Sequence, residues 1–210
     1  MSKGTPVNLI DGKGNLYEGV ISQPDIKKCI VGITKVVHNF ERRNYRLHIA
    51  MSQLKNQERF EWFVEKSVEI GIDEITPLIC RNTEKQSVKT ERINNIIISA
   101  MKKSIKAFKP VFNDPVPFKK FIGMEHNGNK MIAHCREDLT RAGIEEICST
   151  CDSAIILIGP EGDFSEDEIL AASANGFRNI HLGSSRLRSE TAGVVACCQV
   201  SFINQGRLSP

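Results

Sequence analysis

Two polar loops contain the residues of this sequence that are best suited to chemistry. The first reads I-G-P-E-G-D-F-S over residues 158–165, and the second reads L-G-S-S-R-L-R-S-E-T-A over residues 182–192. In the first loop, Gly159 and Gly162 would let the backbone pass close to a ligand and offer it N–H and C=O groups. An ordinary turn from a strand to a helix is the competing interpretation. The first loop therefore indicates either a ligand-binding backbone or a simple connection.

The second loop adds charged side chains that suit anion and proton chemistry. Arg186 and Arg188 could stabilise a negative charge, and Glu190 could accept a proton. In the alternative interpretation, Ser189 or Thr191 caps a final helix and Glu190 complements the dipole of that helix. The two roles are compatible, so the pattern leaves both open.

Basic residues gather in the middle of the chain. Between Arg81 and Lys109 only Glu84 and Glu91 are acidic. The basic residues of this stretch are Arg81, Lys85, Lys89, Arg92, Lys102, Lys103, Lys106 and Lys109. This local excess suits a surface that faces phosphate groups, and a solvated helix face is the alternative.

The overall composition excludes several classes of protein. The chain has 210 residues, of which 40% are hydrophobic and 25% charged, with a formal net charge of +3. This balance excludes an intrinsically disordered chain. The longest apolar runs, such as Ala154 to Ile158, are far shorter than the roughly 20 residues of a membrane-spanning helix. Since the N-terminus also lacks the apolar stretch of a signal peptide, we expect a cytoplasmic protein that does not contact a membrane.

The cysteines favour neither a disulfide framework nor a metal site. The chain has seven of them, an odd number, and Cys197 and Cys198 are adjacent in an apolar stretch. This usage is typical of reduced, buried thiols. We therefore expect free thiols and no bound metal.

Alternating hydrophobicity predicts a small all-β unit over the first fifty residues. Strands are expected at residues 7–10 and 16–21, on either side of D-G-K-G-N, whose glycines can adopt positive φ and close a hairpin. Two further strands are expected at residues 29–37 and 45–51. From residue 56 the apolar spacing becomes that of an amphipathic helix, which ends at Gly71.

Beyond Gly71, short apolar strands alternate with helices. The expected strands cover residues 75–80, 131–135, 154–158 and 180–182, and the expected helices cover residues 90–107, 141–148, 166–174 and 191–205. This order predicts an α/β unit whose mostly parallel sheet is covered on both faces. Because ligands bind beyond the carboxyl ends of parallel strands, the loops that follow strands are expected to form the functional site.

Several motifs, taken in order, resemble one known family. The chain contains K-x-x-E-I-G-x-x-x-I-x-P from Lys66, then G-P-E-G with F-S-x-x-E from Gly159, then L-G-x-x-x-L-R-x-E-T-A from Leu182. This combination resembles the SPOUT methyltransferases and, within them, the ribosomal RNA small subunit methyltransferase E family. The turn at residues 11–14 also resembles a turn in that family's N-terminal PUA-like barrel.

The resemblance implies a fold and an activity that spacing alone does not. The fold would be an α/β trefoil-knot domain over residues 52–210, preceded by a PUA-like β-barrel RNA-binding domain over residues 1–51. The activity would be methyl transfer from S-adenosylmethionine to N3 of a uridine in 16S rRNA of the small ribosomal subunit. The family resemblance and the apolar final helix also predict a homodimer, with burial inside the monomer as the other explanation of that helix.

The same resemblance implies roles for individual residues. The expected cofactor-binding residues are Ala133, Gly159, Pro160, Glu161, Gly162, Leu182, Gly183 and Leu187. The expected catalytic residues are Arg188, Glu190 and Glu161. Arg188 would stabilise the negative charge that develops on the uracil, and either glutamate would accept the N3 proton or orient the arginine. The expected RNA-binding residues are Arg81, Lys102, Lys103, Lys106 and Arg186, and no metal is expected.

The chain departs from the family pattern at a few positions. The family has a glycine where Asp163 stands, an arginine where Ser185 stands, and E-R-S where this chain has Arg81, Asn82 and Thr83. These differences leave two alternatives, which are a SPOUT methyltransferase that acts on another RNA and an RNA-binding module that has lost its activity. The chain is also expected to begin late, so that the barrel would lack its first strand and bind RNA weakly.

Overall fold

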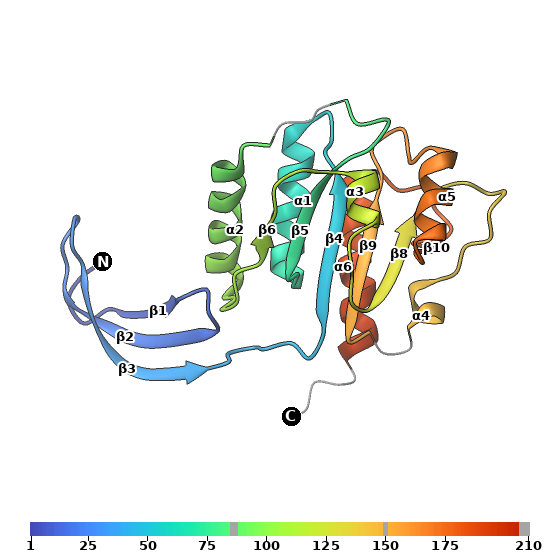
Figure 1. Ribbon diagram of the computed structural model, residues 1–210. Helices are drawn as coiled ribbons and strands as arrows, with labels where there is room; N and C mark the ends of the chain where they lie inside the picture. Colours follow the sequence, from blue (N-terminus) through green and yellow to red (C-terminus); the bar gives the residue numbers. More distant parts are fainter. Residues whose placement is uncertain (85–87, 149–150, 206–210) are drawn as a thin grey trace.

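A parallel sheet with helices on both faces forms the larger part of the protein. The computed structural model describes residues 1–84, 88–148 and 151–205 (Figure 1). The sheet has the strand order β10-β8-β9-β4-β5-β6, and β7 also pairs with β5. Its strands are β4 (Arg46–Ser52), β5 (Glu74–Ile79), β6 (Val111–Phe112), β7 (Val116–Pro117), β8 (Asn129–Ala133), β9 (Ser153–Ile158) and β10 (Arg178–Ile180). Every strand pair in it is parallel, as the sequence predicts.

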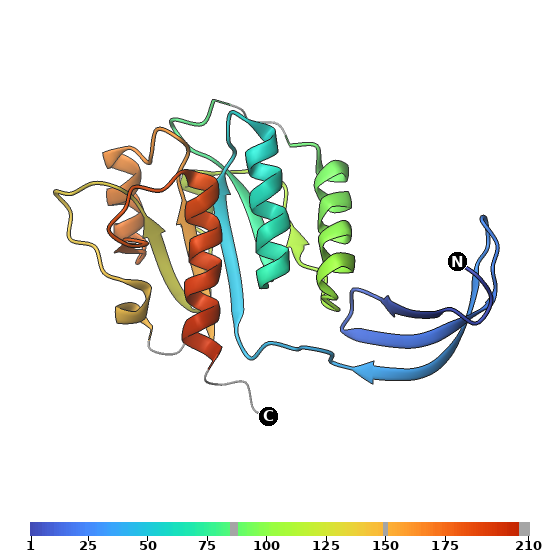
Figure 2. The ribbon, with the colours of Figure 1, turned by 180° about the vertical axis from the view of Figure 1, so that it is seen from behind.

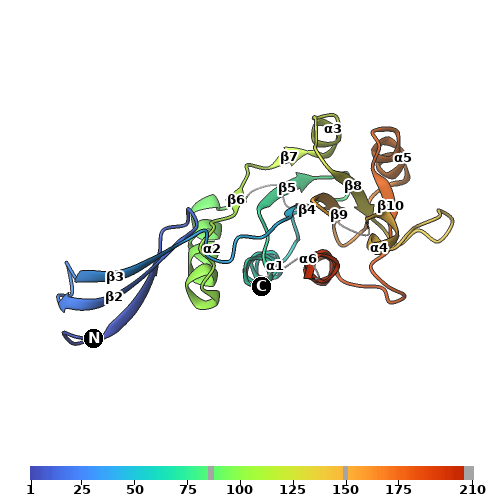
Figure 3. The same ribbon diagram turned by 90° about the horizontal axis from the view of Figure 1, so that it is seen from below.

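Helices cover the two faces unequally. Figure 2 shows α1 (Gln57–Ile70), α2 (Thr90–Ser104) and α6 (Ser189–Gln205) in front of one face. Figure 3 shows α3 (Phe118–Ile122) and α5 (Glu166–Ala174) on the other side of the sheet. The short helix α4 (Ile144–Ile147) precedes β9. Each face has its own apolar core, and alternate strand residues contribute to one core or the other.

Capping residues and a left-handed residue set the ends of three helices of the α/β unit. The side chain of Asn56 accepts the Glu58 N–H at 2.8 Å and caps α1, which ends at Gly71 with φ +124°. Ser165 and Glu168 form a reciprocal capping box at the start of α5. Helix α2 is shorter than predicted because Ile105 adopts a left-handed conformation and ends it at Ser104.

The N-terminal residues form a separate antiparallel sheet beside α2 (Figure 1). Its strands are β1 (Pro6–Ile10), β2 (Asn15–Gln23) and β3 (Ile30–His38). The predicted hairpin is confirmed, since Gly12 and Gly14 have φ of +73° and +102°. The turn is attached to the α/β unit by two backbone hydrogen bonds, from Lys109 N–H to Gly12 O and from Gly14 N–H to Ala107 O, both 2.9 Å long.

The fourth predicted strand is present but belongs to the other sheet. We expected residues 45–51 to complete the N-terminal β unit, and this placement is wrong, because β4 pairs in parallel with both β5 and β9. Residues 47–52 are all buried. A strand buried on both faces belongs in the middle of a helix-covered parallel sheet and not in a small hairpin unit.

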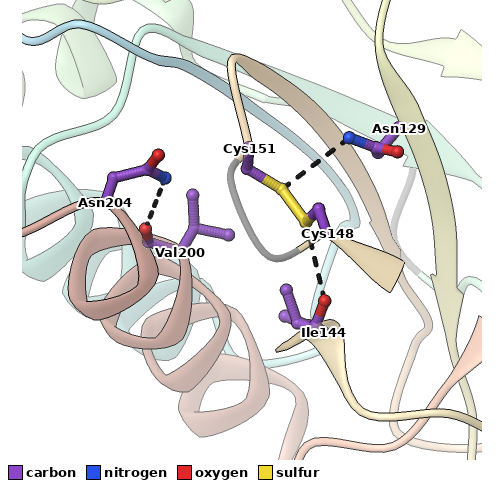
Figure 4. The surroundings of a disulfide bond; sticks show 6 residues. All are labelled: Asn129, Ile144, Cys148, Cys151, Val200 and Asn204. Atoms are coloured by element: carbon purple, nitrogen blue, oxygen red, sulfur yellow. Dashed lines mark hydrogen bonds between the residues drawn. A yellow bond between two sulfur atoms is a disulfide. The ribbon is translucent and has the colours of Figure 1, made fainter. Parts of the chain in front are cut away.

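One pair of cysteines differs from the prediction of free thiols. Cys148 and Cys151 are joined by a disulfide between α4 and β9 (Figure 4). Asn129 lies against it, with its Nδ2 3.9 Å from Cys151 Sγ. The two cysteines are spaced C-x-x-C, which brings their Cα atoms to 5.3 Å. The other five cysteines are free. No helix in the described part of the chain is long and apolar enough to cross a membrane.

Candidate functional site

A pocket of about 440 Å³ lies where three neighbouring strands of the parallel sheet end. The loops after β8, β9 and β10 form its walls, as expected of a ligand site in a parallel α/β sheet. Its lining residues are Arg59, Ala133, His134, Cys135, Arg141, Ile158, Gly159, Pro160, Glu161, Asp163, Ile180, His181, Leu182, Gly183, Ser185, Arg186, Leu187, Arg188, Ser189 and Ala192. The pocket combines apolar side chains, exposed backbone and several arginines, a composition that suits an organic ligand with polar ends.

Most of the predicted site residues meet in this pocket. Seven expected cofactor-binding residues line it, namely Ala133, Gly159, Pro160, Glu161, Leu182, Gly183 and Leu187. Arg186 and Arg188 line it as well. Gly162 and Glu190 are not among the lining residues.

Two glycines shape the pocket wall. A Cβ on Gly159 would lie 3.2 Å from the Phe164 backbone nitrogen and ring, which is tighter than an ordinary contact. Gly183 has φ +120°, and a Cβ there would meet no atom within 4 Å. Gly162 shows neither a positive φ nor a tight contact, because an added Cβ would lie 3.5 Å from Asn82, an ordinary van der Waals distance. The structure therefore gives no steric reason for the glycine at position 162.

The two candidate proton acceptors have different surroundings. Glu161 is exposed, and its Oε1 accepts the Lys55 backbone N–H at 3.1 Å. Glu190 is only 7% exposed at the start of α6. Its Oε1 lies 3.7 Å from Arg59 Nε, and its Oε2 has no hydrogen-bond partner among the described residues. A buried carboxylate oxygen without a partner is costly to stability, and such groups are often functional.

The expected RNA-binding residues fall into two groups. Arg186 lines the pocket, and Arg81 lies in the loop after β5, where its guanidinium is 3.4 Å from Asp167. Lys102 and Lys103 lie in the last turn of α2, the end of the helix that is near the N-terminal sheet, and Lys106 follows the helix (Figure 1). Lys85 lies outside the described residues.

A larger groove lies at the opposite, amino-terminal edge of the sheet. It measures about 990 Å³ and runs between the segment 41–46, the end of α1 and residues 106–111. Basic side chains on its walls include Arg42, Arg43 and Lys106, with Lys109 beside them. The loops after β8, β9 and β10 do not contribute to this groove. We therefore place the ligand-binding site in the smaller pocket, although the groove has the larger volume.

Sequence reasoning missed three charged side chains of the pocket, Arg59, Arg141 and Asp163. Arg59 comes from α1, and its approach to α6 depends on how the two helices pack. Arg141 donates from Nη1 to His134 O at 2.8 Å. Asp163 adopts φ +62° and binds the neighbouring loop through its carboxylate. Only Asp163 had a signal in the sequence, because it stands where the family pattern has a glycine.

His134 also lines the pocket, and its buried Nε2 has no hydrogen-bond partner among the described residues. It is 5% exposed, its Nδ1 accepts the Arg136 N–H at 3.3 Å, and burial lowers its pKa. Across the described residues, no group of three or more histidine, cysteine or acidic side chains is placed to hold a metal ion.

Comparison with known proteins identifies the family. The family model of the RNA methyltransferase domain matches residues 41–201. A ribosomal RNA small subunit methyltransferase E from Rickettsia conorii is 32% identical over 161 residues, which cover 75% of this chain and 64% of that protein. The chain thus matches slightly less than two thirds of that relative.

Solved structures match over nearly the whole chain. A probable rRNA-methyltransferase from Porphyromonas gingivalis has a TM-score of 0.90 and 36% identity, and covers 99% of this chain and 88% of its own. A Legionella pneumophila protein solved in complex with the bound cofactor SAM has a TM-score of 0.86 and 28% identity, and covers 96% and 84%. The resemblance that the motifs indicate is confirmed: the chain belongs to the RNA methyltransferase domain family, and its relatives there are ribosomal RNA small subunit methyltransferases E.

Proposed function

We propose that this protein transfers a methyl group from S-adenosylmethionine to N3 of a uridine in 16S rRNA of the small ribosomal subunit. The observation that carries the proposal is the pocket itself, in which the G-P-E-G and L-G-x-x-x-L-R segments meet at the carboxyl ends of β8, β9 and β10. The names of the relatives support the reaction and the substrate. The proposed substrate implies a cytoplasmic location.

The pocket fits the cofactor in size and in chemistry. Its volume of about 440 Å³ lies within the range of small-molecule sites. The Ile158, Ile180 and Leu187 side chains offer apolar surface to an adenine ring, and the backbone around Gly159 and Gly183 offers hydrogen bonds. The bound SAM of the Legionella relative supports this assignment. When bound, S-adenosylmethionine supplies an activated methyl group on its sulfonium.

The chain's own residues then have to align the uridine and handle one proton. Uracil N3 carries a proton at neutral pH, and charge develops on the flanking oxygens when that proton leaves. Arg188 lines the pocket and would stabilise this charge. Of the two glutamates, we assign the proton to Glu190, because its Oε2 has no hydrogen-bond partner among the described residues, while Glu161 accepts the Lys55 N–H. Glu161 would then position the loop between β4 and α1.

The N-terminal sheet and the basic residues would form the RNA surface. We propose that β1–β3 belong to a PUA-like barrel and that the remaining residues form a SPOUT trefoil-knot domain. The division predicted at residue 51 would then move to the segment before Arg46, since β4 lies in the parallel sheet. Lys102, Lys103 and Lys106 would contact RNA beside the N-terminal sheet, while Arg81 and Arg186 would do so near the pocket.

The attachment of the N-terminal sheet offers a test of this surface. A Cβ on Gly14 would lie 2.4 Å from the Phe108 ring, and Gly14 has φ +102°. Gly14→Ala should therefore displace the hairpin turn. We expect weaker binding of 30S subunits and unchanged binding of S-adenosylmethionine. Equal binding of 30S subunits by the variant and the parent would contradict the proposed role of this sheet.

We propose that the protein acts as a homodimer through the outer side of α1 and α6. These helices lie side by side (Figure 2), and Trp62 and Phe202 are 43% and 65% exposed on them. Light scattering should give twice the monomer mass of 23.5 kDa for the parent and the monomer mass for Phe202→Glu. A parent that scatters as a monomer at micromolar concentration would contradict the dimer.

The reaction is tested on 30S subunits from a strain that lacks this enzyme. The purified protein and S-adenosylmethionine should add one methyl group to a single uridine of 16S rRNA, located by mass analysis of nuclease fragments. Methylation of another RNA but not of 30S subunits would favour the broader SPOUT activity. Absence of cofactor binding would favour an RNA-binding module without activity.

A further inference from the structure

Asp163 holds an uncommon backbone conformation in the wall of the pocket. Its φ is +62°, in the left-handed region that favours glycine. The other described residues with positive φ that are not glycine are Asn39, Glu41 and Ile105, and none of them lines the pocket. Aspartate is one of the few non-glycine residues that tolerate this region, so the contacts of its side chain decide whether it does more than glycine would.

The Asp163 carboxylate joins two loops of the site. Its Oδ2 accepts the Cys135 N–H of the loop after β8, and its Oδ1 accepts the Phe164 N–H of its own loop, both at 2.8 Å. Hydrogen bonds to a carboxylate are stronger than those between neutral groups. The carboxylate therefore fixes the separation of the two loops that form one side of the pocket.

Asn82 attaches a third loop to the same place. Its Nδ2 donates to Gly162 O at 3.3 Å and to Asp163 O at 3.1 Å. Asn82 lies in the loop after β5, and Asp163 in the loop after β9. These are two of the positions at which the sequence departs from the family pattern, and the structure brings them into contact.

We propose that Asp163 and Asn82 are positioning residues that together hold the cofactor pocket in its binding shape. This inference rests on the proposed function, because it takes S-adenosylmethionine as the ligand of the pocket. Both Asp163 oxygens are already engaged by backbone amides, so the side chain acts through the Cys135 and Phe164 positions. The tether also accounts for the aspartate at a position where glycine would be free of backbone strain.

Asp163→Gly distinguishes the effect of the two carboxylate hydrogen bonds from the effect of the backbone strain at φ +62°. The variant removes the backbone strain of the positive φ together with both carboxylate hydrogen bonds. We therefore expect it to fold with unchanged or higher stability. We expect it to bind S-adenosylmethionine about ten-fold more weakly, equal to about 1.4 kcal/mol. Asp163→Asn tolerates the same φ and keeps one oxygen acceptor, so it should recover part of the loss. Asn82→Ala should weaken binding in the same direction, and its effect should be smaller in the Asp163→Gly background.

The test combines titration calorimetry of S-adenosylmethionine with NMR of the Cys135 and Phe164 amides. Both amide resonances should shift in Asp163→Gly without ligand and move part of the way back in Asp163→Asn. Asn39→Gly is the matched control, because it relieves φ +53° away from the pocket and should leave affinity unchanged.

Parent-like affinity of Asp163→Gly would overturn the inference. Equal loss of affinity in the glycine and asparagine variants, with unmoved amide resonances, would also overturn it, because the carboxylate would then contact the ligand directly. If the parent itself did not bind S-adenosylmethionine, the proposed function would fail. The amide shifts would still report whether the tether exists. Should Asp163→Gly not fold, the Asn82→Ala and Asp163→Asn measurements decide the question.

Discussion

Gly183→Ala tests the pocket through backbone conformation alone. Gly183 has φ +120°, and an added Cβ would meet no atom within 4 Å, so the substitution introduces no steric clash with neighbouring residues. Its whole cost comes from forcing an L-residue into that conformation, on the order of 1–3 kcal/mol. For a domain of this size each kcal/mol lowers the Tm by about 2–4 °C.

The cost can appear in two measurable quantities. If the loop keeps its shape, the free energy of unfolding falls by the full amount and cofactor binding is retained. If the loop relaxes to negative φ, stability recovers and the binding wall moves. Because each 1.4 kcal/mol corresponds to a ten-fold change in Kd, we then expect S-adenosylmethionine to bind about ten-fold or more weakly. Thermal unfolding and titration calorimetry on the same preparation measure both.

Gly4→Ala provides the matched control. Gly4 has φ +87° and open space around its Cβ position, but it lies near the N-terminus and away from the pocket. We expect it to lower the Tm at most, with no effect on cofactor affinity. A Gly183→Ala variant with the parent's Tm and the parent's Kd would refute both the strained conformation and the placement of the site.

The two glutamates, His48 and the disulfide each give a measurable outcome. Glu190→Gln should lower kcat for methylation of 30S subunits by about 10²–10⁴-fold with cofactor affinity retained, whereas Glu161→Gln should change kcat only a few-fold; the reverse order would exchange their roles. Burial lowers the pKa of His48 to about 4, below its usual value near 6.5, so the stability that neutral His48 provides is present above about pH 6.5 and lost as pH falls toward 4. His48→Gln should flatten the pH dependence of urea unfolding in that window, and an unchanged profile would exclude His48 as its source. Reducing agent should lower the free energy of unfolding by about 2 kcal/mol, because the Cys148–Cys151 bond closes a short loop, and a double serine variant should not respond to it.

Local signals predicted the elements that carry their own caps. Helix α5 begins at residue 166, as the sequence predicts, and Ser165 and Glu168 form both reciprocal hydrogen bonds of a capping box there. Helix α1 ends at Gly71 for the same kind of reason. In contrast, β6 and β7 have two residues each, which is too short to show any hydrophobic period.

Strands whose place depends on tertiary pairing were harder to predict from the sequence. The strand over residues 46–52 was recognisable, but its partners β5 and β9 follow it by more than twenty and about a hundred residues, and nothing local distinguishes them from a hairpin neighbour. His48 is an example of the difficulty, since it looks like an outward residue. It is in fact 7% exposed. Its burial is tolerated because Thr76 Oγ1 lies 2.8 Å from its Nε2 and forms a hydrogen bond with it.

The same limit applies to the site. The loops after β8, β9 and β10 could be grouped in advance, because parallel strands bring their carboxyl ends to one edge. Arg59 could not be included, since it reaches the pocket only because α1 packs beside α6.

The buried Glu190 links the stability of this fold to its proposed activity. Within the described part of the chain, its Oε2 is buried without a partner, and the partly exposed Arg59 lies 3.7 Å from the other oxygen. An unmatched buried carboxylate lowers the free energy of unfolding, so selection for stability alone would remove it. If Glu190 accepts the uridine proton, as we propose, its place next to Ser189 of the pocket wall gives a reason to keep an oxygen that has no partner among the described residues.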